Sequence, residues 1–507
     1  MSNKQKKNRN WRRWVFFALI LLIVGAVFVG RSRSNTPPRE EIAIGVTAHA
    51  DVKQTQEDSA VVALVRSDKE NAEDISDEEV RSMVREAVAL AGGLEEIVTD
   101  GDFVILKPNM IAAKHVAGGL LAMMDGDEYV EEKLLDPRAN GIATDFRVAR
   151  AVAEMVRELN PSGQIYIMET SGWGNTKRNM EILGYTAENF PMVDKILDFD
   201  DIGSDPAKYE EELVAIDLGD KKIFEEGESL AHTNGLYYMA KTYYSADVII
   251  DLPVLKNHSN AGFTGAVKNV AIGVAPINIY GSGGMLALNR MAISHTWEPL
   301  NKWIHDYYLV KPVDFVVTDG LQGSGYGPVA MGAESLEEAQ QNMRLILAGK
   351  DALAVDTIHA YLVGTDPKQV DYMTLLASEG IGVTDPAKIN VLGNASVGDI
   401  KKKFGLPGFP MSLMSPEPLQ VQYDDFDAPQ VSFENVQITG NTLTANISSD
   451  EALIKLDVYL DGKFAGVVEK SGTNFDIEFS GEGLSSATNI ALRAYDSYLN
   501  SVDLNIK

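Results

Sequence analysis

The sequence of 507 residues predicts an α/β domain over residues 59–404 and an all-β immunoglobulin-like sandwich over residues 430–507. In the first part, apolar runs alternate with amphipathic helical patterns, which predicts a mostly parallel sheet with helices on both faces. In the second part, seven short runs of mostly alternating polarity occupy about 78 residues, a texture typical of a sandwich. Five prolines within residues 405–429 predict a linker between the two parts.

The elements of the α/β domain follow one another from residue 59. A strand is expected over 60–65, and the segment Ser76-Asp77-Glu78-Glu79 has the pattern of a capping box at the start of a helix. Gly92-Gly93 ends that helix, and the segment DFVILKPN at 102–109 predicts a buried strand that runs into a polar loop. The later elements alternate in the same way: helix 145–159, strand 164–170, strand 246–255, strand 314–320, strand 344–349, helices 351–363 and 367–379, and strand 389–393.

The C-terminal runs are separated by turn signals. Asp461-Gly462 stands between two of them and predicts a two-residue hairpin turn. The ending ALRAYDSYLNS resembles the last strands of bacterial Ig-like repeats, with Leu499 where a glycine is usual. Such a module is expected to be a spacer or to bind a surface partner, and to fold separately from the α/β domain.

Composition excludes several classes of function. The net charge is -28, and nine of the 45 basic residues lie in residues 1–39, so 36 basic residues face 73 acidic ones in the rest of the chain. No nucleic-acid partner is expected, because phosphate binding needs a basic face. The absence of cysteine excludes disulfides, thiolate zinc sites and cysteine-ligated iron–sulfur clusters.

The N-terminus predicts a membrane anchor. Residues 14–30 carry no charge, and the basic tail 1–13 precedes them. Seventeen apolar residues are enough to span a bilayer, and the charge asymmetry places the tail in the cytoplasm of a bacterial cell and the rest of the chain outside it. Residues 31–58 are interpreted as a tether. A cleaved signal peptide and export by a twin-arginine route, through Arg12-Arg13, remain alternatives.

Polar residues of kinds that do chemistry stand where the predicted strands end. In α/β sheets, ligands bind beyond the carboxyl ends of the strands, so these residues are expected to share a pocket. They are Lys107, Asn109, Glu169, Lys256, Asn257, His258 and Asp319.

Lys268 and Asn269 lie in an otherwise apolar stretch, where a lysine needs a partner. We expect Lys107, Lys256 and Lys268 to bind a small anion, with the neighbouring asparagines and a loop containing Gly325 and Gly327 completing the binding site. The alternative is structural pairing of Lys268 with a carboxylate of Asp319 or Glu169.

His258 is the first choice for a general acid or base, with Glu169 or Asp319 as its partner in proton transfer. His295, His305 and His359 are weaker candidates. No zinc spacing is present, but a divalent cation held by Asp319, Asp351 or Asp356 is an open alternative.

Several ordered motifs resemble one family. They are KPNM at 107–110, DLPVLKNH at 251–258, GAVKN at 265–269, TDGLQGSGYGP at 318–328 and DALAVD at 351–356. Over residues 59–395 the chain resembles the domain of unknown function called DUF362. The resemblance implies an α/β domain found in bacteria and archaea, sometimes joined to ferredoxin-like iron–sulfur segments, and it implies no established reaction. Without cysteine, this chain cannot carry such clusters.

The function expected from these observations is that of a membrane-anchored, extracytoplasmic enzyme acting on a small carboxylate or phosphate. A non-catalytic ligand-binding or cell-surface interaction protein is the alternative, and an envelope scaffold without a shared pocket is a third hypothesis.

Overall fold

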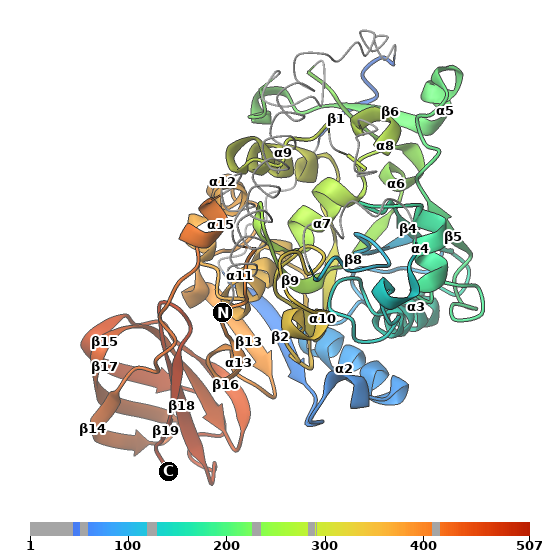
Figure 1. Cartoon of the computed structure of the whole chain (residues 1–507). Coiled ribbons are helices and arrows are strands. Elements are labelled where there is room, and N and C mark those ends of the chain that lie inside the picture. Colours follow the sequence, from blue (N-terminus) through green and yellow to red (C-terminus); the bar gives the residue numbers. More distant parts are fainter. Residues whose placement is uncertain are drawn as a thin grey trace, which may run out of the picture. The chain divides into compact units, whose positions relative to one another are not determined.

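The computed structural model describes residues 44–50, 59–118, 129–225, 235–281, 289–290, 292–407 and 416–507. The expected anchor over 14–30 and most of the expected tether, residues 31–43 and 51–58, lie outside these ranges. Within them, no helix has both the length and the apolar character needed to cross a bilayer. Residues 45–507 form one compact unit, drawn in Figure 1.

The main sheet has ten strands and is mixed (Figure 1). Its path runs β13-β2-β12-β11-β8-β3-β4-β5, and β9 and β10 branch from β11. The pairs β13–β2, β11–β8, β8–β3, β3–β4 and β4–β5 are parallel, whereas β12 is antiparallel to both of its neighbours. The strands are β2 Ala60–Arg66, β3 Phe103–Pro108, β4 Gln164–Glu169, β5 Lys195–Asp198, β8 Val248–Leu252, β9 Val254–His258, β10 Gly262–Thr264, β11 Phe315–Ser324, β12 Leu345–Gly349 and β13 Ile389–Gly393.

Helices pack on this sheet, and the alternation of buried side chains along β3 separates its two faces. Val104 and Leu106 join the core built with α2 and α3, whereas Lys107, one residue further on, points to the side of α7. The longer helices are α2 Asp77–Leu90, α3 Phe146–Leu159, α4 Thr176–Ile182, α7 Ala266–Gly273, α9 Trp297–Val310, α11 Ala352–Leu362 and α12 Asp371–Ser378. The short ones are α5 Tyr209–Glu212, α6 Lys241–Tyr244, α8 Ile277–Tyr280, α10 Leu336–Ala339, α13 Val397–Ile400 and α15 Glu417–Gln420. A small sheet combines β1 Ala48–His49, β6 Leu213–Asp217 and β7 Tyr237–Ala240.

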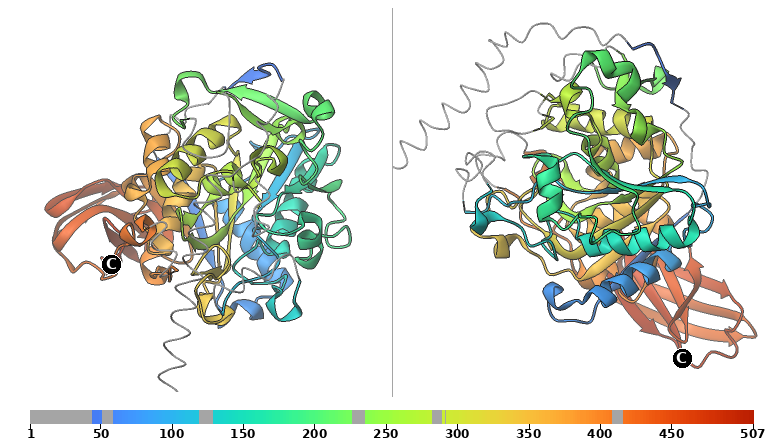
Figure 2. Two further views of the ribbon diagram at one scale, coloured as in Figure 1. Left: turned by 45° about the horizontal axis from the view of Figure 1, so that its top comes forward. Right: turned by 90° about the vertical axis from the view of Figure 1, so that its right-hand side faces the viewer.

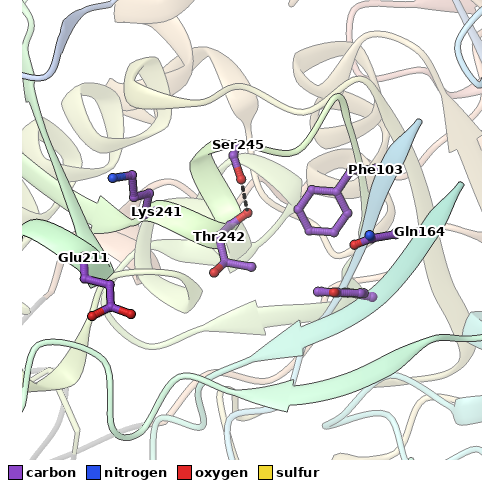
Figure 3. Close-up of a pocket in the computed structure, with 7 residues that line it drawn as sticks. Phe103, Gln164, Glu211, Lys241, Thr242 and Ser245 are labelled. Carbon is purple, nitrogen blue, oxygen red and sulfur yellow. Dashed lines mark hydrogen bonds between the residues drawn. The ribbon is translucent and has the colours of Figure 1, made fainter. Parts of the chain in front are cut away.

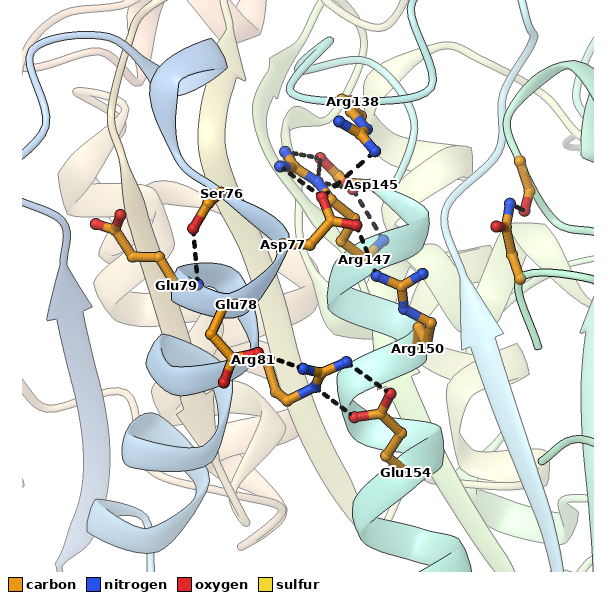
Figure 4. A network of polar contacts seen from close by, with 12 residues as sticks. Ser76, Asp77, Glu78, Glu79, Arg81, Arg138, Asp145, Arg147, Arg150 and Glu154 are labelled. Carbon is orange, nitrogen blue, oxygen red and sulfur yellow. Dashed lines mark hydrogen bonds and ion pairs between the residues drawn. The ribbon is translucent and has the colours of Figure 1, made fainter. Parts of the chain in front are cut away.

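α2 and α3 lie side by side in both views of Figure 2 and are joined by ion pairs, shown in Figure 4. Arg81 on α2 bonds Glu154 on α3 at 2.7 Å. As the capping box predicts, Ser76 caps α2 by accepting a hydrogen bond from the Glu79 N–H at 3.2 Å. At the start of α3, Asp145 caps the helix and pairs with the buried Arg147 at 2.7 Å. The network therefore fixes the amino end of α3 under the sheet.

The single strand expected over 246–255 is divided at Pro253 into β8 and β9. Proline has no N–H for the ladder, so β8 ends there. β9 then runs parallel to β11 and carries the segment Lys256 to His258 away from the body of the sheet. β10 folds back antiparallel to it, with Gly262 opposite His258.

The C-terminal region is antiparallel throughout its six described strands. Two of the seven expected runs form one long strand, β15 Thr442–Leu460. It pairs with four others, which are β14 Val431–Thr439, β16 Lys463–Val468, β17 Gly472–Ser480 and β18 Ile490–Asp496. The last strand, β19 Ser501–Asn505, pairs with β18. The hairpin at Asp461-Gly462 is confirmed, because Leu460 pairs with Lys463 and both turn residues have positive φ. This region has its own apolar core. It also contacts residues of the α/β part, through the Lys455 Nζ–Ile389 carbonyl hydrogen bond at 2.6 Å.

Candidate functional site

The side chains that follow β3, β4 and β8 meet the amino-terminal half of α7 on one face of the sheet. Lys107 at the end of β3 forms an ion pair with Glu169 at the end of β4, and both side chains are almost fully buried. The ammonium of Lys107 also donates to the Pro108 carbonyl at 2.6 Å. The two strand ends are therefore joined by a buried pair of opposite charges.

Two asparagines connect this pair to Lys256. Asn269 Oδ1 lies 3.5 Å from the Lys107 Nζ and accepts from the Asn109 Nδ2 at 2.8 Å. Asn109 Oδ1 in turn accepts from the Lys256 Nζ at 2.6 Å. The Lys256 ammonium also donates to the carbonyl of Ile142. The structure thus brings together Lys107, Asn109, Lys256 and Asn269, four residues that the sequence marked as one site.

α7 approaches this network closely because two glycines allow it. A Cβ at Gly273 would lie 2.6 Å from the Lys107 Nζ, and a Cβ at Gly265 would lie 2.3 Å from the Asp356 carboxyl carbon. Asp356, on α11, accepts from the first backbone N–H groups of α7, Ala266 N at 2.6 Å and Val267 N at 3.1 Å. The carboxylate therefore caps α7 from a neighbouring helix and fixes the position of its first turn.

Lys268 is buried on α7 and makes neither a hydrogen bond nor an ion pair with any residue that the structure describes. Burial and the nearby guanidinium of Arg290 lower the pKa of Lys268 to about 7. Arg290 itself is held by carbonyls, donating to Ile272 at the end of α7 and to Thr170 after β4. The carboxylate pairing that was the alternative for Lys268 is absent here, because Glu169 pairs with Lys107.

His258 has one ring nitrogen in use. Its Nδ1 accepts from the Asn260 backbone N–H at 3.1 Å, which places the proton of the neutral ring on Nε2. Burial and the charge of Lys268 keep the pKa of His258 well below its usual range. The same two causes lower the pKa of Lys256 well below that of a free lysine. His258 Nε2–H is thus a neutral donor, and it makes no hydrogen bond within the described ranges.

Two members of the site were missed by the sequence interpretation. Asp251 accepts from the Asn269 Nδ2 at 2.7 Å, its other oxygen is unpaired, and burial holds its pKa well above the usual range. Its place within the otherwise apolar strand β8 was a usable signal, since a buried carboxylate there needs partners. Arg290 gave no such signal, because a positive φ and loop carbonyls place it.

Three residues expected to bind the ligand are occupied within the protein. Asn257 donates to the Gly405 carbonyl at 2.6 Å and accepts from the Gly327 N–H at 3.0 Å. The Gly325 N–H donates to Ala339 at 2.7 Å. The glycine loop therefore offers neither of these amides to a ligand, and it serves to attach β9 to the segment that follows α13.

The three carboxylates considered for a cation also have separate structural roles. Both oxygens of Asp319 accept backbone N–H groups, from Asp145 at 2.8 Å and Leu321 at 3.0 Å, and burial raises the pKa of Asp319 to about 7. Asp351 caps α11 by accepting from Ala354 N at 3.0 Å. With Asp356 capping α7, no shared cation position is formed by this set among the described residues.

The three weaker histidine candidates, His295, His305 and His359, are not placed for proton transfer in the lysine network. His359 is fully buried and shares its Nε2 with the backbone of Lys256 at 3.1 Å. His305 is held between Asp306 and Glu379. His295 is half-buried, and its Nδ1 bonds the Ile293 carbonyl at 2.9 Å; burial and the charges of Lys268 and Arg290 lower its pKa.

Two hollows of the described surface lie elsewhere. One, with a volume of about 340 Å³, lies at the amino ends of β3 and β4; its lining residues, among them Phe103 and Gln164, are drawn in Figure 3. A groove of about 700 Å³ lies between α9 and α12, beside Trp297 and Asp371. The lysine network is instead at the carboxyl ends of the strands, so neither hollow belongs to it.

Comparison with known proteins bears on this arrangement. Residues 134–361 match the family model described as Domain of unknown function (DUF362). The DUF362 match contains Glu169, Lys256, His258 and Lys268, and it begins after Lys107 and Asn109. It is narrower than the span 59–395 over which the motifs resemble the family.

A curated relative, Thylakoid-associated protein sll1697 of Synechocystis sp., is 22% identical over 297 residues, which cover 58% of this chain and 73% of the relative. A solved structure, the M60 catalytic domain from Clostridium perfringens ZmpC in complex with the sialyl T antigen, is 16% identical with a TM-score of 0.14. The match covers 31% of this chain and 32% of that one, and so low a score carries no argument.

Proposed function

We propose that the protein is a membrane-anchored, extracytoplasmic enzyme that acts on a small anionic substrate, a carboxylate or a phosphate. The observation that carries the proposal is Lys268, a buried amine with no carboxylate partner among the described residues. Its neighbours Lys256 and Arg290 are bases as well, so neither supplies a negative charge. A buried positive charge without a counter-charge is costly, and an anion that enters the site removes that cost.

The balance of charge supports an anion as the ligand. Glu169 is already paired with Lys107, and burial raises the pKa of Asp251 well above its usual range. Burial thus disfavours the ionised form of Asp251, and neither acid pairs with Lys268 among the described residues. An anionic substrate would meet the Lys268 amine and the Nε2–H of His258, neither of which makes a hydrogen bond within the described ranges.

For proton transfer, the pKa values favour Lys268 over His258. An amine with a pKa of about 7 is present in both protonation states near neutral pH, as a general acid or base requires. His258 has a pKa well below its usual range, so it stays neutral and acts as a hydrogen-bond donor. The sequence had given the proton-transfer role to His258, and the proposal moves it to Lys268.

The location is proposed from the N-terminal sequence, in which the basic tail 1–13 precedes the apolar run 14–30. A relative described as thylakoid-associated is consistent with membrane attachment. Protease added to spheroplasts should then digest the globular part, whereas protection until lysis would reverse the topology. For the C-terminal region we propose an immunoglobulin-like fold, with the antiparallel β14–β19 as its support.

Replacing Lys268 by Met tests the site. The variant keeps the stem and removes the charge, so its melting temperature should equal or exceed that of the wild type, while stabilisation by a panel of small carboxylates and phosphates disappears. Lys388→Met, at an exposed position outside the site, is the control and should keep the ligand effect. A large loss of stability in Lys268→Met would contradict the anion site. Product analysis with the ligands that bind then separates an enzyme from a binding protein.

A further inference from the structure

We propose a calcium site formed by Asp425, Glu451, Asp496 and Asn500, independent of the lysine site. One ligand oxygen from each of the three carboxylates lies within 4.8 Å of the others. Asp425 precedes β14, Glu451 lies within β15, and Asp496 ends β18. The three carboxylates thus come from three separate segments of the chain, which an ion would hold together.

The side chain of Asn500 points to a ligand in this cluster. It is 1% exposed, and its Nδ2 donates to Asp496 Oδ2 at 2.7 Å and to Asp425 Oδ1 at 3.2 Å. Its Oδ1 is buried and has no hydrogen-bond partner. Leaving that acceptor unpaired is costly, and turning the amide would place its oxygen against two carboxylates. A cation removes the conflict, because the turned amide oxygen then becomes a fourth ligand.

The cluster has more negative charge than the protein neutralises. Glu451 makes no hydrogen bond or ion pair in the described structure, and the carboxylates of Asp425 and Asp496 lie close to it. The nearby cation is Lys401, which donates to the Tyr498 carbonyl at 2.8 Å. Its single ammonium opposes three carboxylates, so a divalent cation fits the remaining charge.

The ligand set favours Ca²⁺ over other metals. All the ligands are carboxylate or amide oxygens, which suit Ca²⁺ and Mg²⁺ and disfavour zinc or copper. Ca²⁺ accepts oxygens at about 2.3–2.6 Å in flexible geometry and can bridge oxygens 4.8 Å apart. Mg²⁺ binds oxygens at about 2.0–2.1 Å in a strict octahedron. Oxygens up to 4.8 Å apart would have to move closer together to form that octahedron.

Bound calcium would attach the segment before the C-terminal sheet to the turn between β18 and β19. That turn is preformed, since Asp496 Oδ1 accepts from the backbone N–H groups of Tyr498 at 2.8 Å and Asn500 at 2.9 Å. Only Asp425 and Glu451 must then be drawn to the ion. A site completed in this way typically has a Kd of about 10⁻⁴–10⁻³ M, as in extracellular modules.

The test uses the full chain after removal of metal with a chelator. Its melting temperature is followed while CaCl₂ or MgCl₂ is added at constant ionic strength, and Tb³⁺ luminescence sensitised by Tyr423 and Tyr498 reports direct binding. We expect Ca²⁺ to raise the melting temperature with half its effect at about 10⁻⁴–10⁻³ M, and Mg²⁺ to need at least about tenfold more.

Glu451→Gln should abolish the calcium-dependent rise and leave the calcium-free melting temperature equal or higher, because Glu451 bonds nothing and its like-charge contacts are lost. Asp425→Asn is a second variant with the same expectation. Glu469→Gln, at an exposed position in the same region, is the matched control and should respond as the wild type does. An unchanged wild-type melting temperature up to about 10 mM Ca²⁺ would overturn the proposal. So would a calcium response that survives in both Glu451→Gln and Asp425→Asn.

Discussion

Gly265 leaves no room for a side chain beside Asp356, since a Cβ there would lie 2.3 Å from the carboxyl carbon of that aspartate. The φ of Gly265 is -101°, so the need for glycine here is one of space rather than of backbone conformation. The same carboxylate caps the first turn of α7, and α7 carries Lys268 and Asn269. The position of the lysine site thus depends on a close contact between two elements 90 residues apart in sequence.

Gly265→Ala should therefore destabilise the protein by about 1–3 kcal/mol, the usual cost of forcing extra volume into a packed contact. The added methyl group would displace the Asp356 carboxylate and release the Ala266 and Val267 amides. Urea unfolding measures this difference. Gly45→Ala is the control, because a Cβ at Gly45 meets nothing within 4 Å. Equal stability of both variants would show that Asp356 moves aside at no cost.

The Lys107–Glu169 pair predicts a pH-dependent loss of stability in Lys107→Met. Burial, opposed by Lys107, raises the pKa of Glu169 to about 7, so above pH 7 the wild type has this group ionised both folded and unfolded. Without Lys107 the folded-state pKa rises further, and the folded variant retains a proton that the unfolded chain has lost. The stability difference between wild type and variant should then grow by up to about 1.4 kcal/mol per pH unit above pH 7.

Denaturant unfolding at pH 6 to 9 measures that growth. In the double variant Lys107→Met/Glu169→Gln the titrating group is gone, and the difference from the wild type should stay constant above about pH 8, where Glu169 of the wild type is ionised in both states. A constant difference in Lys107→Met itself would show that Glu169 is not the partner that matters.

The buried pair on β15 predicts non-additive effects. Lys455 Nζ and Asp457 Oδ1 are 3.4 Å apart, and both side chains are almost fully buried. Lys455→Met leaves the Asp457 carboxylate buried without its cation and should lower the free energy of unfolding by about 3–5 kcal/mol. The double variant Lys455→Met/Asp457→Leu should be less destabilised than that single variant. A double-mutant cycle by urea unfolding measures the coupling. Additive effects would mean that Lys455 acts only through its hydrogen bond to the Ile389 carbonyl.

The sequence predicts most of the elements because their signals are local. Capping by Ser76 and the turn at Asp461-Gly462 depend on neighbours within a few residues, and both are observed. The mixed direction of the sheet follows from β12, whose antiparallel pairing with β2 joins residues about 280 positions apart, as in Ala63 opposite Ala348. Single-sequence patterns carry no information on such a pairing.

The candidate site also has a part that local sequence signals predict and a part that depends on long-range contacts. Strand ends predicted that Lys107 and Lys256 would lie near one another, and two asparagines do connect them. Which polar groups are left free depends on tertiary partners, and those could not be predicted. The Asn257 side chain accepts from the Gly327 N–H, whereas Lys268 has no hydrogen-bond or ion-pair partner in the part of the chain that the structure describes.

The unpaired Lys268 predicts how anion binding depends on pH. Burial and Arg290 lower the folded-state pKa of Lys268 to about 7, so only below that pH is the empty site mostly protonated. If the anion binds the protonated amine, its affinity should fall by up to about tenfold per pH unit between pH 7 and 9. The sign for stability is the reverse: the cost of burying the charge is fully present below pH 7. It disappears as pH rises toward the unfolded-state pKa of 10.5.

Calorimetric titration of a carboxylate that stabilises the protein, repeated from pH 6 to 9, measures this dependence. A carboxylate stays ionised over that range, so any change in affinity comes from the protein. Binding should also take up close to one proton per site at pH 8, because the bound anion raises the pKa of the Lys268 amine above 8. The apparent enthalpy of binding should therefore vary with the ionisation enthalpy of the buffer. Lys388→Met should reproduce the wild-type profile. An affinity that stays constant from pH 6 to 9, without proton uptake, would show that Lys268 does not face the ligand.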